Sequence, residues 1–392
     1  MFIFHLGNSG FPSGTNAVMQ RIGLTFKGLK LAGCNPLVIS KHSLYEAENR
    51  KRINRYQGIP YIYTSILTTR PDNFIIRNLN KISGYFGELF LLIKKRKSIQ
   101  AAIFYGPSFI ELVYYRILSK ILRFKLIIQY VELISEIQPN HIVHGLNGKA
   151  FDNYCFVFCD GIIVISEFLR NRSLSKNKSL PIIKIPAICD FEEFQQITGK
   201  KYQANYLMYC GSIGYYSVIE FIIDLYCRLR ELGFYQGRLL LAIGIGDKNE
   251  TSYLELINKI EGCGYGDSIV LEKNVPHVRL IEIYLSAELL IVPLRNVIQD
   301  IAGFHHKVGE YSAAEKPIIS TNRGEVQYYF RDGISAILAD EYTIESYLQK
   351  LSEVLPFKEQ LKKIAEEGHK VGKEKLNYMN YGFELKQFIL SI

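Results

Sequence analysis

A chain of 392 residues is too long for one ordinary hydrophobic core, and its length fits two domains of roughly 200 residues each. A hydrophobic content of 48% with 22% charged residues is typical of a globular protein and argues against intrinsic disorder. The seven cysteines include no Cys-x-x-Cys pair, so neither a zinc site nor a disulfide framework is indicated and a reducing cytoplasm fits best.

The charge is unevenly distributed along the chain. Residues 1–200 contain 26 Lys and Arg against 13 Asp and Glu, a net charge of +13. The whole chain carries +9, so the remaining residues carry −4. A basic first half calls for an anionic neighbour, which could be nucleic acid, a membrane surface or an acidic acceptor. No recognition helix and no RNA-binding aromatic motif is present, which argues against nucleic acid.

The first predicted strand is Met1 to Leu6, which has no basic segment before it and is therefore not interpreted as a signal peptide. A glycine-rich loop follows to Asn16, and a helical pattern follows the loop. Strand, loop and helix form the first element of a doubly wound sheet, whose loops bind ligands at the carboxyl ends of the strands. The glycines lack the G-x-G-x-x-G spacing of a dinucleotide site, and an ordinary turn is the alternative.

Further strands are expected in the first half of the chain. The carboxylate of Glu132 directly follows the strand predicted over residues 125–131. The pattern predicts a helix over Phe109–Leu122, and residues 41–58 are too irregular to place. Glu132 directly follows the last strand, so it is a candidate to face a ligand at the carboxyl edge of the sheet. The predicted strands are residues 36–40, 61–66, 101–105 and 125–131.

Residues 84–97 combine an apolar segment with four consecutive cations, Lys94 to Lys97. One interpretation is a core-facing helix whose last turn carries cations that complement its dipole. The other is a helix that rests on an anionic lipid surface. No apolar run in the chain reaches the roughly 18 residues that a membrane-spanning helix requires.

The second half begins with another strand, glycine-rich turn and helix. Tyr206 to Cys210 reads as a strand, and Gly211, Ser212 and Gly214 form a turn suited to phosphate at a helix N-terminus. A further strand from Leu239 ends in Gly-x-Gly at Gly246. More strands are expected over residues 270–275, 289–293 and 317–320, and a short helix over residues 276–285.

Lys307 and Glu310 lie three residues apart in a helical pattern that begins near His306. On a helix they share one face, about 5–6 Å apart. Free backbone N–H groups in a first turn would join the Lys ammonium in an anion site, and Glu310 could accept hydrogen bonds from a diol. Phosphate beside a diol describes the ribose diphosphate of a sugar nucleotide. The alternative is an exposed ion pair, worth a few tenths of a kcal/mol.

The run from Phe304 through Lys307, Glu310, Tyr311, Lys316 and Pro317 resembles the donor-site signature of retaining glycosyltransferases of family 4. The likeness continues to Leu338, and residues 185–194 resemble the family's hinge between domains. This chain departs from the family in three places. Ala302 replaces the first of two Glu, Glu315 replaces a small residue, and residues 215–217 stand where a Lys or Arg is usual.

The resemblance implies an α/β protein of the GT-B fold, with two Rossmann-like parallel-sheet domains facing a cleft. We expect an acceptor-side domain over residues 1–190, a donor-binding domain over 200–372, and a terminal helix over 373–392 that packs back on the first domain. By this resemblance Lys307 holds the diphosphate and Glu310 the ribose, while Glu132 serves as an acceptor-side acid or base. The other expected donor contacts are Gly14, Thr15, Gly211, Ser212, Gly214 and Gly246.

The expected activity is transfer of a sugar from a nucleoside-diphosphate sugar to a hydroxyl of a glycan or lipid-linked acceptor, with retention, in cell-surface polysaccharide synthesis. No cofactor and no metal is expected, because the family implies none and no Asp-x-Asp triplet is present. The expected location is the cytoplasm, peripheral at the inner face of a membrane. The alternative is a catalytically weak partner protein that binds sugar nucleotides on the same fold. An epimerase or phosphorylase is less favoured, because no matching cofactor lysine signature is found.

Overall fold

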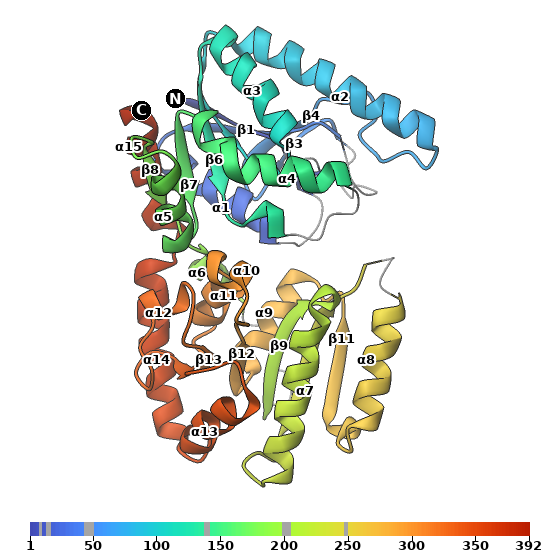
Figure 1. Cartoon of the computed structure of the whole chain (residues 1–392), viewed down its shortest axis with the longest axis vertical. Helices are drawn as coiled ribbons and strands as arrows, with labels where there is room; N and C mark the ends of the chain where they lie inside the picture. The colour runs from blue at the N-terminus through green and yellow to red at the C-terminus, as the bar shows by residue number, and fades with distance from the viewer. Residues whose placement is uncertain (8–9, 13–16, 43–50, 137–141, 198–204, 247–249) are drawn as a thin grey trace. The chain divides into compact units, whose positions relative to one another are not determined.

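The computed structural model describes residues 1–7, 10–12, 17–42, 51–136, 142–197, 205–246 and 250–392. The chain divides into two compact units (Figure 1). Unit 1 comprises Met1–Ile188 together with Tyr378–Ile392, and unit 2 comprises Cys189–Asn377. The chain therefore leaves unit 1 once and returns to it with its last residues.

Unit 1 is built on an eight-stranded sheet with the order β3-β4-β2-β1-β5-β6-β7-β8. Every described pairing in it is parallel except that between β3 and β4. The central strands are buried apolar runs, as expected for a parallel sheet covered on both faces. The strands are β1 (Phe2–Leu6), β2 (Asn35–Ser40), β3 (Ile53–Tyr56), β4 (Ile59–Tyr63), β5 (Ile99–Phe104), β6 (Lys125–Tyr130), β7 (Gly161–Val164) and β8 (Ile182–Lys184).

The antiparallel pair β3–β4 is a hairpin that the irregular sequence of residues 41–58 concealed. Its two-residue turn is Gln57 and Gly58, with φ values of 46° and 78°. Positive φ at both positions matches the twist of a tight hairpin, and Gln is an unusual residue there. The usual Asn-Gly signal is absent, which is why the sequence pattern did not predict this strand. Residues 43–50 lie outside the described residues.

The helices of unit 1 agree with their sequence signals where capping residues are present. The predicted helix over Phe109–Leu122 is confirmed as α3, with Ser108 as its N-cap and Arg123 in the left-handed conformation at its end. Ser166 is the N-cap of α5, where its Oγ accepts from the Leu169 amide at 3.2 Å. The helices are α1 (Ala17–Leu31), α2 (Phe74–Lys95), α3 (Phe109–Leu122), α4 (Ile142–Tyr154), α5 (Glu167–Lys176) and α15 (Tyr381–Ser391).

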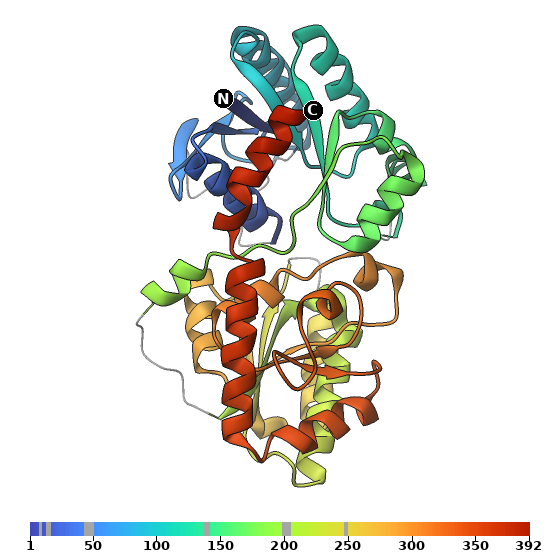
Figure 2. The same cartoon turned by 90° about the vertical axis from the view of Figure 1, so that its left-hand side faces the viewer.

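The C-terminal helix α15 packs against α1 through two glycines (Figure 2). A Cβ added at Gly382 would lie 2.1 Å from the Gly28 carbonyl oxygen, and one at Gly28 would lie 3.3 Å from the Gly382 Cα. The two helices therefore approach at backbone distance, which no larger residue allows. This contact holds the end of the chain in unit 1.

The segment with the four cations ends α2, and most of the large apolar residues of this helix do not face the core. The buried residues of α2 are Asn80, Gly84, Glu88 and Leu92. Large hydrophobic residues of the same helix are exposed. Only Leu92 among the large apolar residues of α2 is buried, while Lys94 and Lys95 lie in the last turn, where the helix dipole favours cations. Among the described helices, none combines the length and the apolar character needed to cross a membrane.

Unit 2 has a six-stranded parallel sheet with the order β11-β10-β9-β12-β13-β14. Numbered within the unit this is 3-2-1-4-5-6, the doubly wound order of nucleotide-binding folds, and its switch point lies between β9 and β12. The strands are β9 (Tyr206–Ser212), β10 (Arg238–Gly244), β11 (Ile269–Lys273), β12 (Leu289–Val292), β13 (Ile318–Thr321) and β14 (Ile337–Ala339).

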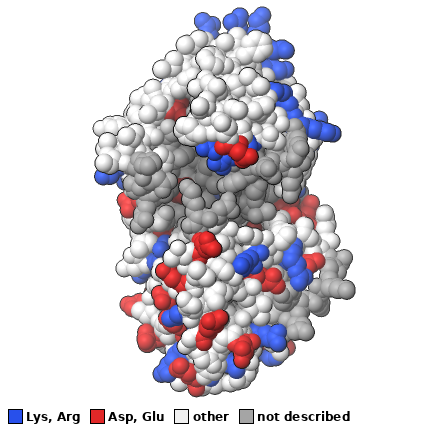
Figure 3. Space-filling model, turned by 90° about the vertical axis from the view of Figure 1, so that its right-hand side faces the viewer, with Lys and Arg blue, Asp and Glu red and all other residues white. Residues whose placement is uncertain are grey.

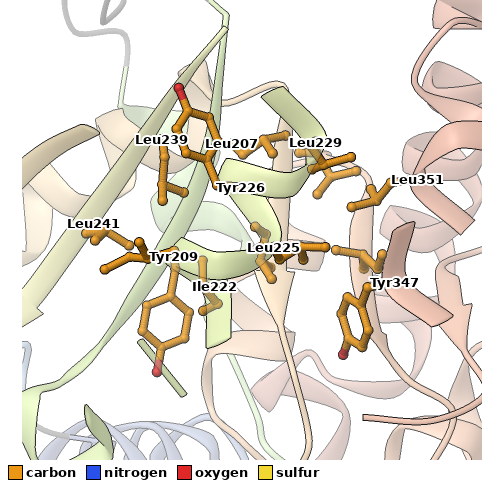
Figure 4. Close-up of a cluster of buried hydrophobic side chains, with 14 of the residues drawn as sticks. Leu207, Tyr209, Ile222, Leu225, Tyr226, Leu229, Leu239, Leu241, Tyr347 and Leu351 are labelled. Atoms are coloured by element: carbon orange, nitrogen blue, oxygen red, sulfur yellow. The ribbon is translucent and has the colours of Figure 1, made fainter. Parts of the chain in front are cut away.

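The core of unit 2 lies between this sheet and the helices α7 and α13 (Figure 4). Ile222, Leu225 and Leu229 of α7 pack on strand residues and on α13, and all three are almost completely buried. The helices of unit 2 are α6 (Phe191–Gln196), α7 (Tyr216–Glu231), α8 (Glu250–Gly262), α9 (His277–Ser286), α10 (Ile298–Ala302), α11 (Lys307–Ala313), α12 (Val326–Tyr329), α13 (Ile344–Val354) and α14 (Lys358–Lys375).

The chain passes between the units at two places, just before α6 and just after α14. Asp190 caps α6, where its Oδ1 accepts from the Glu192 and Glu193 amides at 3.2 and 3.4 Å. The Cys189 amide donates to the Leu376 carbonyl at 2.8 Å, so both passages are tied together inside unit 2. Residues 373–377, placed in the terminal segment by the sequence, belong to unit 2, because α14 continues to Lys375.

Candidate functional site

The candidate site lies in unit 2, at the switch point of its sheet. Gly211 and Ser212 are the last residues of β9, so the turn after this strand begins at Ile213, and the loop after β12 contains Arg295. Both loops leave the carboxyl ends of neighbouring strands, the edge at which open parallel sheets bind ligands. Helix α11 brings Lys307 and Glu310 to the same region, since the side chain of Lys307 reaches the end of β9.

Lys307 is anchored on β9 by two contacts. Its Nζ donates to the Cys210 carbonyl at 2.7 Å and lies 4.4 Å from the centre of the Tyr209 ring. The side chain is partly buried, and this burial lowers the pKa of Lys307. The groups of Cys210, Tyr215 and Glu310 act in the opposite direction and raise it. These contacts hold the Lys307 ammonium at the end of β9, next to Gly211 in the sequence of that strand.

Gly211 serves this lysine indirectly. A Cβ at Gly211 would lie 2.3 Å from the Tyr209 hydroxyl oxygen, and the Tyr209 side chain is only 2% exposed. Any larger residue would displace the ring that supports the Lys307 ammonium. The glycine is required here for packing, whereas the sequence pattern suggested close approach of a phosphate.

Glu310 is buried, with 8% of its surface exposed, and its Oε2 accepts from the Tyr284 hydroxyl at 3.3 Å. In the described part of the chain, no ion pair joins it to Lys307. The alternative of an exposed ion pair is therefore wrong. No hydrogen bond to Oε1 of Glu310 is present among the described residues, so this oxygen can accept from a ligand.

Several backbone amides near Lys307 and in the glycine turn already have acceptors. The amides of Val308 and Gly309 donate to the carbonyls of His305 and His306 at 3.0 and 3.1 Å, and the Glu310 amide donates to His306 at 3.5 Å. In the glycine turn, the Gly214 amide donates to Ser212 Oγ at 3.2 Å. These four N–H groups have acceptors within their own turns, and the binding of phosphate by the remaining amides stays a prediction.

Arg295 is a cation at this site that sequence reasoning missed. Its guanidinium lies 5.4 Å from the centre of the Tyr215 ring and is held by Asp300. Tyr215 stands in the segment where the resembled family has a cation. Arg295 therefore brings positive charge to that segment from the neighbouring strand, 80 positions along the chain. The sequence signal that could have identified Arg295 is its position shortly after the buried strand β12.

His305 and Ala302 complete the surroundings of Arg295. Burial lowers the pKa of His305 to about 4, and the positive charge of Lys307 acts in the same direction. The ring is therefore neutral near pH 7. Ala302, which replaces the family's first Glu, is fully buried at the end of α10.

The other predicted residues are Gly246, Gly14, Thr15 and Glu132. Gly246 follows Ile245, whose amide and carbonyl are both bonded to the Asn274 side chain at 2.7 and 3.1 Å. Gly14 and Thr15 lie outside the described residues. Glu132 belongs to unit 1, where burial and then Asp152 raise its pKa, a direction that suits a proton donor. Its role stays a prediction.

The described arrangement can bind an anion and an adjoining diol. Arg295 and Lys307 bring two cations to one end of the sheet, and each is oriented by an aromatic ring. A carboxylate oxygen of Glu310 remains available one helical turn beyond Lys307. Cations with fixed orientation stabilise charge that develops on a departing group without reorganisation at the moment of reaction.

Comparison with known proteins identifies the domain to which this site belongs. Residues 190–371, nearly all of unit 2, match the family described as "Glycosyl transferases group 1". A D-inositol 3-phosphate glycosyltransferase from Thermobifida fusca (strain YX) is 24% identical over 153 residues, which cover 38% of this chain and 34% of that protein. This chain therefore matches about a third of the length of that curated relative.

Solved structures share the fold over the whole chain. HepE from Anabaena, crystallised in complex with UDP, has a TM-score of 0.70 and 13% identity, covering 100% of both chains. Sucrose-phosphate synthase from Thermosynechococcus elongatus has a TM-score of 0.71 and 15% identity, covering 100% of this chain and 98% of the other. The predicted GT-B fold, with two Rossmann-like parallel-sheet units, is confirmed.

Proposed function

We propose that this chain is a glycosyltransferase, which moves a sugar from a nucleoside-diphosphate sugar to a hydroxyl of a glycan or lipid-linked acceptor. The observation that carries the proposal is the anchoring of Lys307 at the carboxyl end of β9, beside Arg295 and at the switch point of a glycosyl-transferase domain. HepE, which has the same fold, binds UDP according to its solved structure.

In the proposed reaction, Lys307 and Arg295 bind the diphosphate. Bond cleavage at the sugar leaves extra negative charge on that diphosphate, so both cations interact more strongly with the transition state than with the bound donor. Lys307 is held by the Cys210 carbonyl and the Tyr209 ring before any ligand arrives. Catalysis then consists mainly of positioning and leaving-group stabilisation.

Glu310 binds the ribose in this proposal. Its Oε2 is held by Tyr284, and Oε1 can accept a hydrogen bond from a ribose hydroxyl. A charge-assisted hydrogen bond of this kind contributes about 1.5–3 kcal/mol. Since Glu310 lies one turn after Lys307 on α11, both contacts are made to one rigid element. The identity of the base is left open by these contacts.

Retention of configuration, hexosyl transfer and a role in cell-surface polysaccharide synthesis complete the proposal. They follow from the likeness of residues 304–338 to retaining glycosyltransferases of family 4. Glu132 is the proposed acid or base on the acceptor side, since its pKa is raised by burial. The proposed location is the cytoplasmic side of a membrane, in agreement with seven cysteines that are all free thiols.

A second candidate function is that of a sugar-nucleotide-binding partner with little turnover. The buried Ala302 favours it, because the family's first Glu is missing from this position. The candidate predicts binding of the donor without its consumption. The site geometry around Lys307 and Glu310 is common to both candidates, so only turnover separates them.

A panel of nucleoside diphosphates and their sugars tests both candidates. Each compound is scored by thermal shift, and each binder is then assayed for donor hydrolysis and for transfer to glycan and lipid-linked acceptors. A ligand at a hundredfold over its Kd stabilises the folded chain by about 2.7 kcal/mol. Release of nucleoside diphosphate supports the enzyme. Thermal stabilisation without release supports the binding partner, and no stabilisation by any nucleoside diphosphate contradicts both.

A further inference from the structure

The helix α2 is inverted with respect to an ordinary surface helix. Its inward face carries Asn80, Gly84, Glu88 and, near its end, Leu92, whereas most of its large apolar residues point away from the core. A surface helix in water normally buries an apolar stripe and exposes its polar residues. The inversion therefore calls for a partner that covers the outer face.

Close packing fixes the rotation of α2 about its axis. A Cβ at Gly84 would lie 2.1 Å from the Lys41 carbonyl oxygen, and one at Gly87 would lie 2.1 Å from the Thr64 carbonyl oxygen. Both contacts are with backbone, which cannot move aside as a flexible side chain can. The two glycines must therefore face inward, and the opposite side of the helix must face outward.

Hydrogen bonds on the inward face support the same orientation. Asn80 accepts from the Leu67 amide at 2.8 Å and donates to the Leu67 carbonyl at 3.0 Å. Thr64 Oγ1 donates to the Gly84 carbonyl at 2.8 Å. The Asn80 side chain and the Gly84 carbonyl are satisfied by unit 1 itself, so turning the helix would leave these groups unpaired in an apolar place.

The outward face is a continuous apolar stripe. Its residues are spaced by three or four positions, which places them on one side of the helix. Their exposed fractions range from 45% to 69%. At 1.5 Å per residue the 22 residues of α2 extend over about 33 Å. The stripe consists of Ile75, Leu79, Ile82, Phe86, Phe90 and Ile93.

The neighbouring helix α3 extends this apolar face. Ile110, Ile117 and Ile121 are 55% to 69% exposed and follow a helical spacing. The two helices touch where the rings of Tyr85 and Tyr114 meet, 6.0 Å between centroids and edge to face. A single exposed hydrophobic residue is normal on a protein surface, but a stripe on two adjacent helices marks an interaction site.

The charge around this face is positive. Lys94, Lys95, Arg96 and Lys97 at the end of α2 are all exposed, while Glu88, the helix's one acidic residue, is fully buried. Figure 3 shows one side of unit 1 that is mostly uncharged, with Lys and Arg gathered along its upper edge. An apolar stripe that ends in cations is typical of helices that lie in the interface of an anionic bilayer.

We propose that the outer face of α2 and α3 docks on the surface of an anionic lipid bilayer, with the stripe inserted among the headgroups and Lys94–Lys97 paired with phosphate. The positive charge of this face favours an anionic bilayer over a second copy of the chain. Self-association through this face would bring the cations of the two copies together. The docking does not depend on the proposed transfer reaction. It would hold an enzyme at a surface where lipid-linked acceptors are found.

The test is co-sedimentation of the full chain with vesicles of phosphatidylglycerol and phosphatidylcholine, set against vesicles of phosphatidylcholine alone. We expect binding to the anionic vesicles only, falling steeply as salt rises. The double variant Phe86→Gln and Phe90→Gln should bind at least about tenfold more weakly, because both rings leave the stripe. Replacing all four residues of Lys94–Lys97 by Gln should weaken binding to the anionic vesicles. It should also make the remaining binding less sensitive to salt.

Matched controls separate this surface from general stickiness and charge. Phe383→Gln removes a 62% exposed phenylalanine of α15, and Gln at Lys358, Lys362, Lys363 and Lys373 removes four exposed cations of unit 2. Both controls should bind as the parent does. Equal binding to neutral vesicles, or none to either kind, overturns the proposal. The proposal is also overturned if vesicle binding is absent and analytical ultracentrifugation shows a dimer that the Phe86→Gln and Phe90→Gln double variant abolishes.

Discussion

Arg295 and Asp300 are joined by three hydrogen bonds. The backbone amide and Nε of Arg295 donate to Oδ2 of Asp300 at 2.8 and 3.0 Å, and Nη2 donates to Oδ1 at 2.9 Å. This side-on pairing holds the guanidinium over the Tyr215 ring and leaves Nη1 without a hydrogen bond among the described residues. Burial opposes ionisation of Asp300, but the hydrogen bonds from Arg295 bring the pKa of its carboxyl below the ordinary value.

The first prediction concerns Arg295. Replacing it by Gln should weaken nucleoside-diphosphate binding at least about tenfold, because a cation oriented toward the diphosphate is lost. Isothermal titration calorimetry with the diphosphate that stabilises the parent most strongly measures the effect. Arg279→Gln is the matched control, since Arg279 pairs with Glu282 on one helix surface at 2.7 Å. Equal losses in the two variants would contradict a ligand role for Arg295.

The second prediction concerns Lys307 and Glu310. Replacing either by Ala should reduce kcat/KM for transfer at least about tenfold, corresponding to about 1.4 kcal/mol of transition-state stabilisation. Thermal unfolding should show that each variant is folded at the assay temperature.

A second pair with the same spacing serves as the control for these variants. Glu367 and Lys370 form an exposed ion pair at 2.6 Å, also three residues apart on a helix. Replacing them should change activity little, because exposed pairs contribute well under 1 kcal/mol. Turnover near the parent value in both Lys307→Ala and Glu310→Ala would refute the assignment of the donor site.

The third prediction follows from Ala302. With no carboxylate at this position, the donor sugar gains fewer charged hydrogen bonds than it would from the resembled family's first Glu. We expect the nucleoside diphosphate alone to bind nearly as tightly as the complete sugar nucleotide. Calorimetry on both ligands measures the difference, and a sugar nucleotide bound at least about a hundredfold more tightly would contradict it.

The fourth prediction concerns Glu315, the residue at which the chain departs from the family's small residue. Glu315 follows α11 with a φ of 53°, a left-handed conformation that glycine adopts without strain. Glu315→Gly should therefore raise the free energy of unfolding by about 1 kcal/mol. Glu315→Ala retains the strain and is the control. Chemical denaturation of all three proteins decides, and equal stability of the Gly and Ala variants would contradict the explanation.

The fifth prediction is a pH dependence of stability from Glu88. Burial raises the pKa of Glu88 to about 7 in the folded chain, against an ordinary value of 4.5, while the charge of Lys41 lowers it. Between these values the folded state holds a proton that the unfolded state has lost. The contribution of Glu88 to stability is thus present below about pH 4.5 and is lost as the pH rises through about 7.

Glu88→Gln removes this dependence. The stability of the variant relative to the parent should increase between about pH 5 and about pH 8, by up to about 3 kcal/mol at 1.36 kcal/mol for each unit of pKa shift. Urea denaturation at both pH values measures the difference. A gap between variant and parent that does not change with pH would show that Glu88 ionises normally.

Local signals in the sequence predicted much of this fold because they report local physics. Apolar runs marked the buried strands of both sheets, and the helical pattern over Phe109–Leu122 matches α3. Lys307 and Glu310 could be selected from their spacing, since a helix brings such positions together without help from the rest of the chain.

Contacts between distant residues were decided only by the tertiary structure. Arg295 and Tyr215 are 80 positions apart and meet because β9 and β12 are neighbours in the sheet. Whether Gly214 could offer its amide to a phosphate depended on Ser212, whose hydroxyl accepts it. Spacing predicts which residues share a face, but it does not show which polar groups already have partners.

The inverted helix α2 shows this limit most clearly. Its sequence determined that one side is apolar and the other is small and polar, and the usual inference would bury the apolar side. The structure buries the other side, because Gly84 and Gly87 let the helix backbone approach the carbonyls of Lys41 and Thr64. Amphipathic periodicity establishes that a helix has two faces. Which face meets the core depends on the shape of the surface that receives it, and residues far along the chain form that surface.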